Sequence, residues 1–247
     1  MILSEKHNKS YLQRISSVLL INGGFLDNPG LYSGETGLVL FFFHYARHTQ
    51  NGLYRKYSFD LIEKIQNRIH QETPINYKQG LSGIGSTIEY LVKEGYIEAD
   101  TDEALEDIDN RIFFTYNLPN LPIDEVISIG YYANWRMSGS SSKKDMIRQT
   151  ILTPVEDIMR DHAIIPAWRQ VDCKNNVLDF NGLLRRFTPV HDVNATFDTV
   201  LGNLDLGIQN GLAGLGLSLL TELDGDYSWI SLFPEGLTPV QNESLPV

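Results

Sequence analysis

A glycine-rich turn that leads directly into an apolar helix occurs three times in the sequence, and this feature constrains the fold most. The three turns lie at residues 30–37, 80–85 and 211–216. The residues after each turn are mainly apolar, so the helices they predict have no polar face and must be covered on both sides. Glycine allows a positive φ angle and close backbone approach, which a tight connection between packed helices requires. We therefore expect a layer of buried helices, each beginning at a glycine turn.

The spacing of the turns indicates a repeat. Gly34 and Gly83 are 49 residues apart, and Gly130 follows Gly83 by 47, which predicts a degenerate fourth copy at residues 129–135. Gly214 lies 84 residues beyond Gly130, close to two further periods. Periods of this length are typical of helical-hairpin repeats. The expected fold is all-α, an α/α toroid of inner and outer helices.

Helices of a second kind are predicted between the turns. Residues 11–21, 53–70 and 101–114 carry apolar side chains three and four positions apart, which places them on one face and leaves the other for solvent. These helices are expected to form the outer layer. Asp100 resembles a helix cap, and Thr153 before a proline predicts a helix start that splits residues 143–162.

The acidic residues of the third outer helix are most simply a solvated face. They are Asp102, Glu103, Glu106, Asp107 and Asp109.

The later part of the chain has weaker signals. One more hairpin is expected within residues 163–205, but only short helices at 182–187 and 195–204 are predicted there. Prolines and few apolar residues make 234–247 a surface tail, so that residues 1–233 form a single domain.

Composition excludes several classes of partner and site. Lys and Arg total 20 against 31 Asp and Glu, giving a net charge of −11 and a pI near 4.9, so nucleic acid and membrane surfaces are not expected as partners. One cysteine allows neither an intrachain disulfide nor a multi-cysteine zinc finger. The amino terminus lacks a signal-peptide core, and the longest apolar run, residues 37–46, is too short to span a bilayer. These features predict a cytoplasmic protein.

The three glycine turns resemble the repeated signature of the lanthionine synthetase C-like family, cyclases that close thioether rings in ribosomal peptides. Residues 30–43 resemble the opening repeat, 80–91 the second and 205–216 the closing one. Such turns also occur in other α/α toroids, including terpene cyclases and glycosidases. The resemblance implies a ring of seven inner and seven outer helices, with the glycine turns around one end of a central cavity. The present chain has room for about five hairpins at the observed period, so either the ring is shortened or middle repeats are lost.

The resemblance also implies a zinc ion, held by a cysteine on one inner turn and a Cys-His pair on the next, which activates the peptide thiol. The sequence contains no Cys-His pair, and its single Cys173 lies in a polar stretch without a glycine turn. No metal ligand can be assigned by the resemblance, and we expect no metal or other cofactor.

Two other groups of residues are candidate catalytic or metal-binding sites. Cys173, His191 and Asp192 have the types of a nucleophile, base and orienting group, or of three metal ligands, although a buried thiol and a surface histidine are favoured. His44 and His48 are four residues apart on one helix face, and a core His44 with satisfied hydrogen bonds is favoured over a metal ligand.

Glu35 lies inside the first glycine turn, where the positive end of a helix dipole explains an acidic residue. If Glu35 shared a cavity with Asp124 or Glu125 at the start of the third inner helix, the carboxylates could perform general acid–base catalysis. Six residues are predicted to line the same rim and to bind a peptide or a sugar, although aromatic packing is the commoner use of such tyrosines. They are Tyr32, Tyr131, Tyr132, Asn134, Gln209 and Asn210.

The leading hypothesis is a zinc-less relative of the cyclases that binds a peptide substrate or leader peptide as a non-catalytic accessory component. The alternatives are a zinc-independent hydrolase or lyase that uses the carboxylates, and a remnant with only a structural role. A shortened ring would expose apolar side chains such as Phe41, Phe42 or Leu219 at its open edge unless residues 163–205 cover them, and such an edge favours a homodimer.

Overall fold

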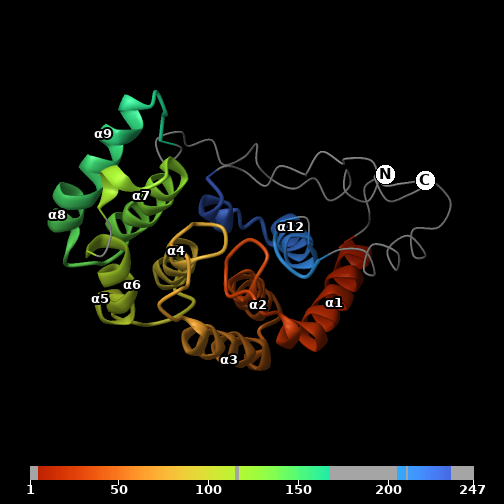
Figure 1. Cartoon of the computed structure of the whole chain (residues 1–247). Helices are drawn as coiled ribbons and strands as arrows, with labels where there is room; N and C mark the ends of the chain where they lie inside the picture. The colour runs from red at the N-terminus through yellow and green to blue at the C-terminus, as the bar shows by residue number, and fades with distance from the viewer. Residues whose placement is uncertain (1–4, 115–116, 167–204, 210, 235–247) are drawn as a thin grey trace, which may run out of the picture.

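The computed structural model describes residues 5–114, 117–166, 205–209 and 211–234 (Figure 1). Within these ranges every regular element is a helix, and the one β-type pairing is an isolated bridge between Asp205 and Gly211. The prediction of an all-α fold is confirmed.

In the described part of the chain, four helices form the inner layer and lie side by side as an arc (Figure 1). In spatial order they are α12 (Leu212–Asp224), α2 (Glu35–Thr49), α4 (Leu81–Lys93) and α7 (Ile123–Ser138). Their apolar sequences are covered by neighbours and by the outer layer, so most of their side chains are buried. Two elements distant in sequence, α12 and α2, are neighbours in this arc.

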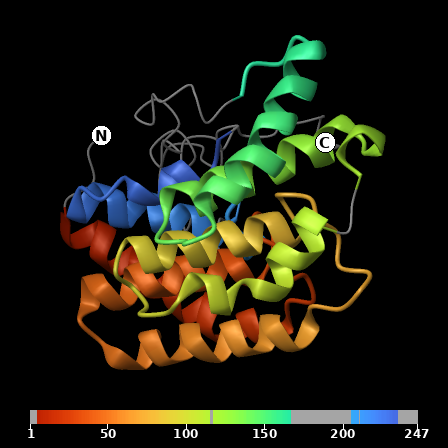
Figure 2. The ribbon, with the colours of Figure 1, turned by 90° about the vertical axis from the view of Figure 1, so that its left-hand side faces the viewer.

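The outer layer consists of helices with one apolar stripe. It begins with α1 (Glu5–Asn22), the short 3-10 turn η1 (Gly23–Phe25) and α3 (Gly52–Arg68), which packs against α2 (Figure 2). It continues with α5 (Thr101–Ala104), α6 (Glu106–Asp109) and the π-helical η2 (Asn110–Phe114), and then, after η3 (Leu118–Asn120), with α8 (Lys144–Ile147), η4 (Arg148–Leu152) and α9 (Thr153–Asp161). Each predicted outer helix is present, and Asp100 caps α5 through the backbone N–H of Asp102 at 2.9 Å.

The three glycine turns share one geometry. In each, the N–H of the first helical residue donates to a carbonyl seven residues earlier, at 2.7 to 2.9 Å; the pairs are Glu35 to Asn28, Leu81 to Pro74, and Leu212 to Asp205. The glycines just before them have φ angles of −126° to −124°, which any residue can adopt. The chain requires glycine there because a Cβ atom on Gly34 would lie 2.2 Å from the carbonyl oxygen of Asn28. Close approach, and not a positive φ, therefore explains the motif.

The turns gather at one end of the inner layer, as predicted. The N–H of Tyr32 in the first turn donates to the carbonyl of Lys78 in the second at 2.9 Å. The carbonyl of Tyr32 accepts from the N–H groups of Ile208 and Gln209 in the third turn, at 2.8 and 3.0 Å. Tyr32 thus links all three turns.

One predicted boundary is wrong and another is confirmed. Gly130 does not mark a turn, because it lies inside α7, which begins at Ile123 after Pro122 without any glycine. α9 begins at Thr153 as predicted, with Pro154 in its first turn, but Thr153 makes no capping hydrogen bond and has helical dihedral angles, so α9 continues directly from η4. The error at Gly130 came from extending the period to a segment that has a single glycine.

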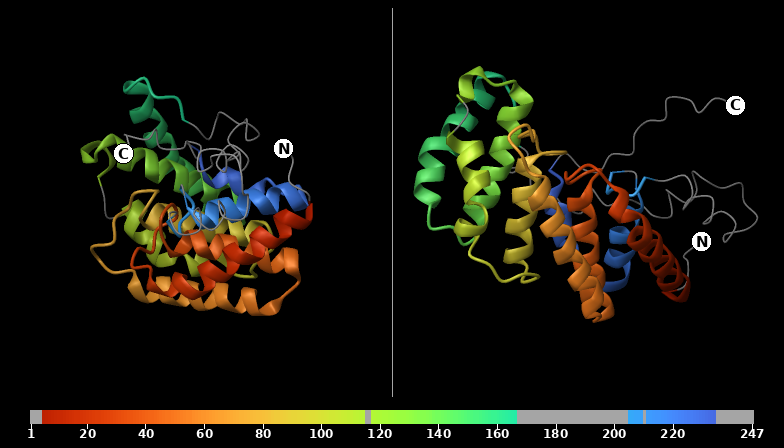
Figure 3. Two further views of the ribbon diagram at one scale, coloured as in Figure 1. Left: turned by 90° about the vertical axis from the view of Figure 1, so that its right-hand side faces the viewer. Right: turned by 60° about the horizontal axis from the view of Figure 1, so that its bottom comes forward.

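The prediction of an exposed edge at the first and last inner helices is also wrong. Phe41, Phe42 and Leu219 are fully buried, because α12 packs directly against α2 and is flanked on its other side by α1 (Figure 3). A Cβ atom on Gly216 would lie 2.4 Å from the ring of Phe41, so the two helices meet closely at this point. The first and last inner helices are neighbours.

A short 3-10 segment, η7 (Ser228–Leu232), lies on the concave side of the arc (Figure 1). Ser228 and Tyr90 of α4 share a hydrogen bond between their hydroxyls at 2.7 Å, and Trp229 is buried. Phe233 packs edge-on against Tyr32 with ring centroids 5.1 Å apart. The segment therefore extends along the inner layer from the carboxyl end of α4 to the glycine turns.

Several predicted features lie outside the described residues. They are the short helices at 182–187 and 195–204, Cys173, His191, Asp192, Asn210, and the tail beyond residue 234.

Candidate functional site

A cavity of about 470 Å³ opens at the glycine-turn end of the inner layer. It lies between the second glycine turn and the first three helical turns of α7, and Tyr32 of the first glycine turn completes its wall. The residues lining it are Tyr32, Asn76, Tyr77, Lys78, Gln79, Asp124, Ile127, Ser128 and Tyr131. Three phenol rings, two carboxamides and one charge of each sign thus surround one space.

Ser128 fixes the second turn to α7. Its hydroxyl donates to the carbonyl of Asp124 at 2.7 Å and accepts from the backbone N–H of Tyr77 at 3.1 Å. Tyr77 then packs edge-on against Tyr131, with centroids 5.1 Å apart, and burial raises the pKa of its phenol. These contacts hold two walls of the cavity in place without a ligand.

Three of the predicted site residues meet in this cavity. Tyr32, Tyr131 and Asp124 line it together, whereas Glu125 is not among the lining residues. Gln209 is half-buried and contacts Tyr32 through its backbone N–H.

Two other predicted rim residues lie elsewhere on α7. Tyr132 is fully buried and donates its hydroxyl to Asp109 at 2.6 Å, and Asn134 is half-buried outside the cavity. Their expected position depended on a turn at Gly130, which does not exist.

Lys78 was missed, although the sequence carried a signal for it. Tyr32, Lys78 and Gln209 each stand two residues before the glycine that precedes an inner helix. Aligning the turns on that glycine places all three at the same rim position. Asn76 and Gln79 belong to the same turn, where the Asn76 carboxamide accepts from the Gln79 N–H at 2.8 Å.

Glu35 does not face this cavity, which corrects the expectation of a carboxylate pair. Its buried carboxylate accepts from Lys64 at 2.5 Å and from Arg68 at 3.2 Å, both on the outer helix α3. The residue therefore ties the first inner helix to the outer layer, and Asp124 lines the cavity without it.

His44 lies in a buried polar cluster at the opposite end of the inner layer. Its Nε2 is 2.8 Å from the hydroxyl of Tyr90, its Nδ1 is 2.9 Å from that of Tyr96, and Asp226 lies 3.6 Å away. Burial lowers the pKa of His44 to about 4. The interpretation as a core histidine with satisfied hydrogen bonds is confirmed.

The acidic cluster of the third outer helix is not simply a solvated face. Arg136 of α7 is fully buried and forms ion pairs with Glu89, with Asp102 at 2.6 Å and with Asp109 at 2.8 Å. The prediction was wrong for Asp102 and Asp109 because their partner lies 27 or more residues along the chain. Burial also raises the pKa of Glu89.

Across the described part of the chain, no three His, Cys, Asp or Glu side chains are grouped so that they could hold a metal ion. The same part includes no helix with the length and apolar character needed to cross a membrane.

A model of the family described as lanthionine synthetase C-like protein matches residues 26–162, more than half of the chain. The chain belongs to the lanthionine synthetase C-like family. The match covers α2 to α9, and the structure adds α12, whose turn has the same geometry as the two inside the match. The chain matches no curated protein and no solved structure.

The zinc ion associated with lanthionine synthetase C-like cyclases does not fit the described residues that line the cavity at the glycine turns. The sequence has no adjacent Cys and His, and its one cysteine, Cys173, lies outside the described residues. The cavity at the glycine turns is lined by one carboxylate and no histidine or cysteine, which is not a zinc donor set.

Proposed function

We propose that this lanthionine synthetase C-like chain binds a peptide and acts as a non-catalytic component in the maturation of a thioether-type modified peptide. The cavity at the glycine turns carries the proposal. It stands at the end of the inner layer where the family's turns gather, and it is lined by recognition groups without a metal donor set.

The lining suits a peptide. Asn76 and Gln79 can each donate to and accept from a peptide backbone, and the rings of Tyr32 and Tyr131 offer flat apolar surface with a polar tip. The volume lies within the range of about 300–1,000 Å³ that small-molecule and cofactor pockets show, which here admits a few side chains.

The two charges at the rim of the cavity favour one orientation of a bound peptide. Asp124 and Lys78 line the same cavity, so a peptide with a cationic and an anionic group has a favoured orientation.

The chemistry of the cavity favours binding over catalysis. Cyclisation needs a group that lowers the pKa of the peptide thiol, and the lining residues include no ligand set for the metal that would do so. The alternative, a hydrolase or lyase with paired carboxylates, is left without support because Glu35 is engaged by Lys64 and Arg68.

The test uses two fluorescently labelled peptides, one linear with Ser, Thr, Cys and one lysine, and one of the same sequence closed by a thioether ring. Fluorescence anisotropy should show saturable binding of at least one. Tyr131→Ala and Asp124→Asn should weaken that binding about tenfold.

The matched control is Glu125→Gln, which removes the same charge one residue away from Asp124 but outside the cavity lining. It should change the affinity by less than about twofold. Failure of both peptides to bind would overturn peptide recognition. Ring closure of a dehydrated peptide by the purified chain would overturn the non-catalytic role.

A further inference from the structure

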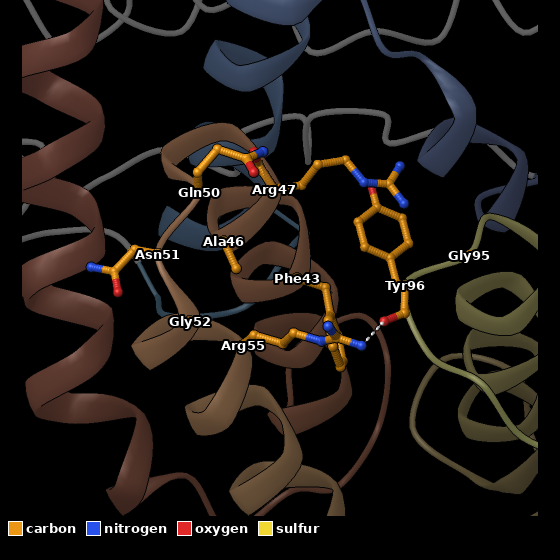
Figure 4. Close-up of a pocket in the computed structure, with 9 residues that line it drawn as sticks. All are labelled: Phe43, Ala46, Arg47, Gln50, Asn51, Gly52, Arg55, Gly95 and Tyr96. Carbon is orange, nitrogen blue, oxygen red and sulfur yellow. Dashed lines mark hydrogen bonds between the residues drawn. The ribbon is translucent and has the colours of Figure 1, made fainter.

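A second cavity lies at the other end of α2, away from the glycine turns (Figure 4). It has a volume of about 300 Å³ and is formed where α2 ends, α3 begins and the chain leaves α4. The residues lining it are Phe43, Ala46, Arg47, Gln50, Asn51, Gly52, Arg55, Gly95 and Tyr96.

Two arginines and no carboxylate line this cavity, although the chain as a whole carries a net charge of −11. Arg47 donates to the backbone carbonyl of Glu94 at 2.6 Å, and Arg55 donates to that of Tyr96 at 3.3 Å. Among the described residues neither arginine forms an ion pair with a carboxylate. A guanidinium has five N–H donors, so one carbonyl bond leaves most of each group's capacity for a ligand.

Both guanidinium groups are held by aromatic rings. The central carbon of the Arg47 guanidinium lies 3.4 Å from the ring centroid of Tyr96 (Figure 4). The hydroxyl of Tyr96 is in turn hydrogen-bonded to His44. Arg55 lies over the ring of Phe59 at 5.8 Å. Both arginines are solvent-exposed, but these contacts orient their guanidinium groups before any ligand arrives, which lowers the conformational entropy that binding costs.

Arg47 and Arg55 line the same cavity because the turn between α2 and α3 is short. Gln50 ends α2 with a left-handed φ of 52°, and Asn51 caps α3 by accepting from the N–H of Leu53 at 3.0 Å. The negative end of the α2 dipole and the positive end of the α3 dipole meet at this turn and oppose each other. Asp226 interacts electrostatically with Arg47 from outside the cavity, but no lining residue is acidic, so Arg47 and Arg55 supply the charges that an anion in the cavity would meet.

We propose that this cavity binds a small oxyanion, a phosphate or carboxylate group, between Arg47 and Arg55. The planar, forked guanidinium matches both groups, and two of them can bind one oxyanion from two sides. The proposal does not depend on peptide binding at the glycine turns, because the two cavities share no lining residue.

Isothermal titration of the purified chain tests this site, with inorganic phosphate and acetate added separately at constant ionic strength. Saturable binding of at least one is expected. Arg55→Gln should weaken it about tenfold or more, because a charged hydrogen-bond donor is lost. Arg55→Lys keeps the charge but loses the fork, and should give an intermediate loss.

Lys56→Gln is the matched control. It removes the same charge from the next residue of α3, and Lys56 pairs with Asp60 outside the cavity. Binding should change by less than about twofold. Arg47→Gln, checked by thermal unfolding because Arg47 packs on Tyr96, should repeat the loss.

The comparison of probes identifies the group recognised, since tighter phosphate binding indicates a phosphate-bearing ligand and tighter acetate binding a carboxylate. Absence of saturable binding to both probes would overturn the proposal. An equal loss in Lys56→Gln and Arg55→Gln would do the same, because the binding would then reflect diffuse charge.

Discussion

At the scale of single residues, Arg136 holds the outer helices to α7. Its guanidinium is fully buried and has ion pairs with three carboxylates from α4, α5 and α6. Arg136→Ala would leave the buried carboxylates of Glu89 and Asp109 without their cation, which should cost about 3–5 kcal/mol of unfolding free energy. Urea denaturation measures this loss. Arg160→Ala, which removes an exposed partner of Asp157, should cost less than about 1 kcal/mol.

His44 predicts a dependence of stability on pH. Its pKa in the folded protein is about 4, below the ordinary 6.5, so the unfolded chain takes up the proton first as the pH falls. The contribution of His44 to the free energy of unfolding is therefore complete above pH 6.5. It decreases by roughly 3 kcal/mol in all as the pH falls from about 6.5 to 4. The groups around it are Tyr90, Tyr96, Asp226 and Arg47, and Asp226, whose pKa is lowered, adds its own loss only at lower pH.

Urea midpoints measured from pH 7 to pH 4 check this prediction. In His44→Gln the urea midpoint should change less between pH 6.5 and pH 4 than it does in the unmodified protein, whatever the effect of the substitution on absolute stability. His48→Gln is the control on the same helix and should retain the slope. An unchanged slope in His44→Gln would show that other groups cause the acid sensitivity.

Local sequence patterns predicted residues whose role depends on their own segment. His44 in an apolar helix, and Asp100 before a helix, were both read correctly. Arg136 and Glu35 could not be read this way, because their partners lie 27 to 47 residues away along the chain and on other helices. Long-range ion pairs leave no local signal.

At the scale of elements, the glycine before each inner helix predicts an asymmetry among glycine substitutions. A Cβ atom on Gly80 would lie 2.0 Å from the carbonyl oxygen of Pro74, and backbone atoms cannot move aside as a flexible side chain can. Gly80→Ala should cost about 2 kcal/mol or more. Gly52→Ala, at the first residue of α3 with nothing within 4 Å of the added atom, should cost nothing measurable. Thermal unfolding distinguishes them, and equal effects would contradict the close-approach explanation.

The inner helices were predictable because three turns repeat the same glycine at the same place before an apolar run. The expected start of the third inner helix at Asp124 or Glu125 agrees with α7. The turn before it was not predictable, since Pro122 stands where the other turns have glycine, and counting the period led to Gly130 inside the helix. The cavity at the turns was found only in part for the same reason. Tyr131 lines it from the third helical turn of α7, one turn beyond Ile127, and no glycine-turn motif marks that position.

At the scale of the whole molecule, the last described helix completes the core around the first ones. α12 lies between α1 and α2, where Gly216 meets both Phe41 and Ile15. A chain that ends at Ile164 would expose these surfaces and should lose its cooperative unfolding transition. A chain that ends at Pro234 keeps every described contact and should retain the transition. Thermal melts followed by near-UV circular dichroism compare the two, and a cooperative melt of the shorter chain would contradict the prediction.

The neighbouring position of α2 and α12 also has a consequence for biosynthesis. α2 ends at Thr49, and its neighbour α12 ends at Asp224, about 175 residues later. At about 5–20 residues per second, a ribosome needs roughly 10–35 seconds to make that stretch. Throughout this time the aromatic side chains of α2 that face α12 have no native cover. We expect the nascent chain to depend on a chaperone that shields apolar segments until translation of α12 is complete.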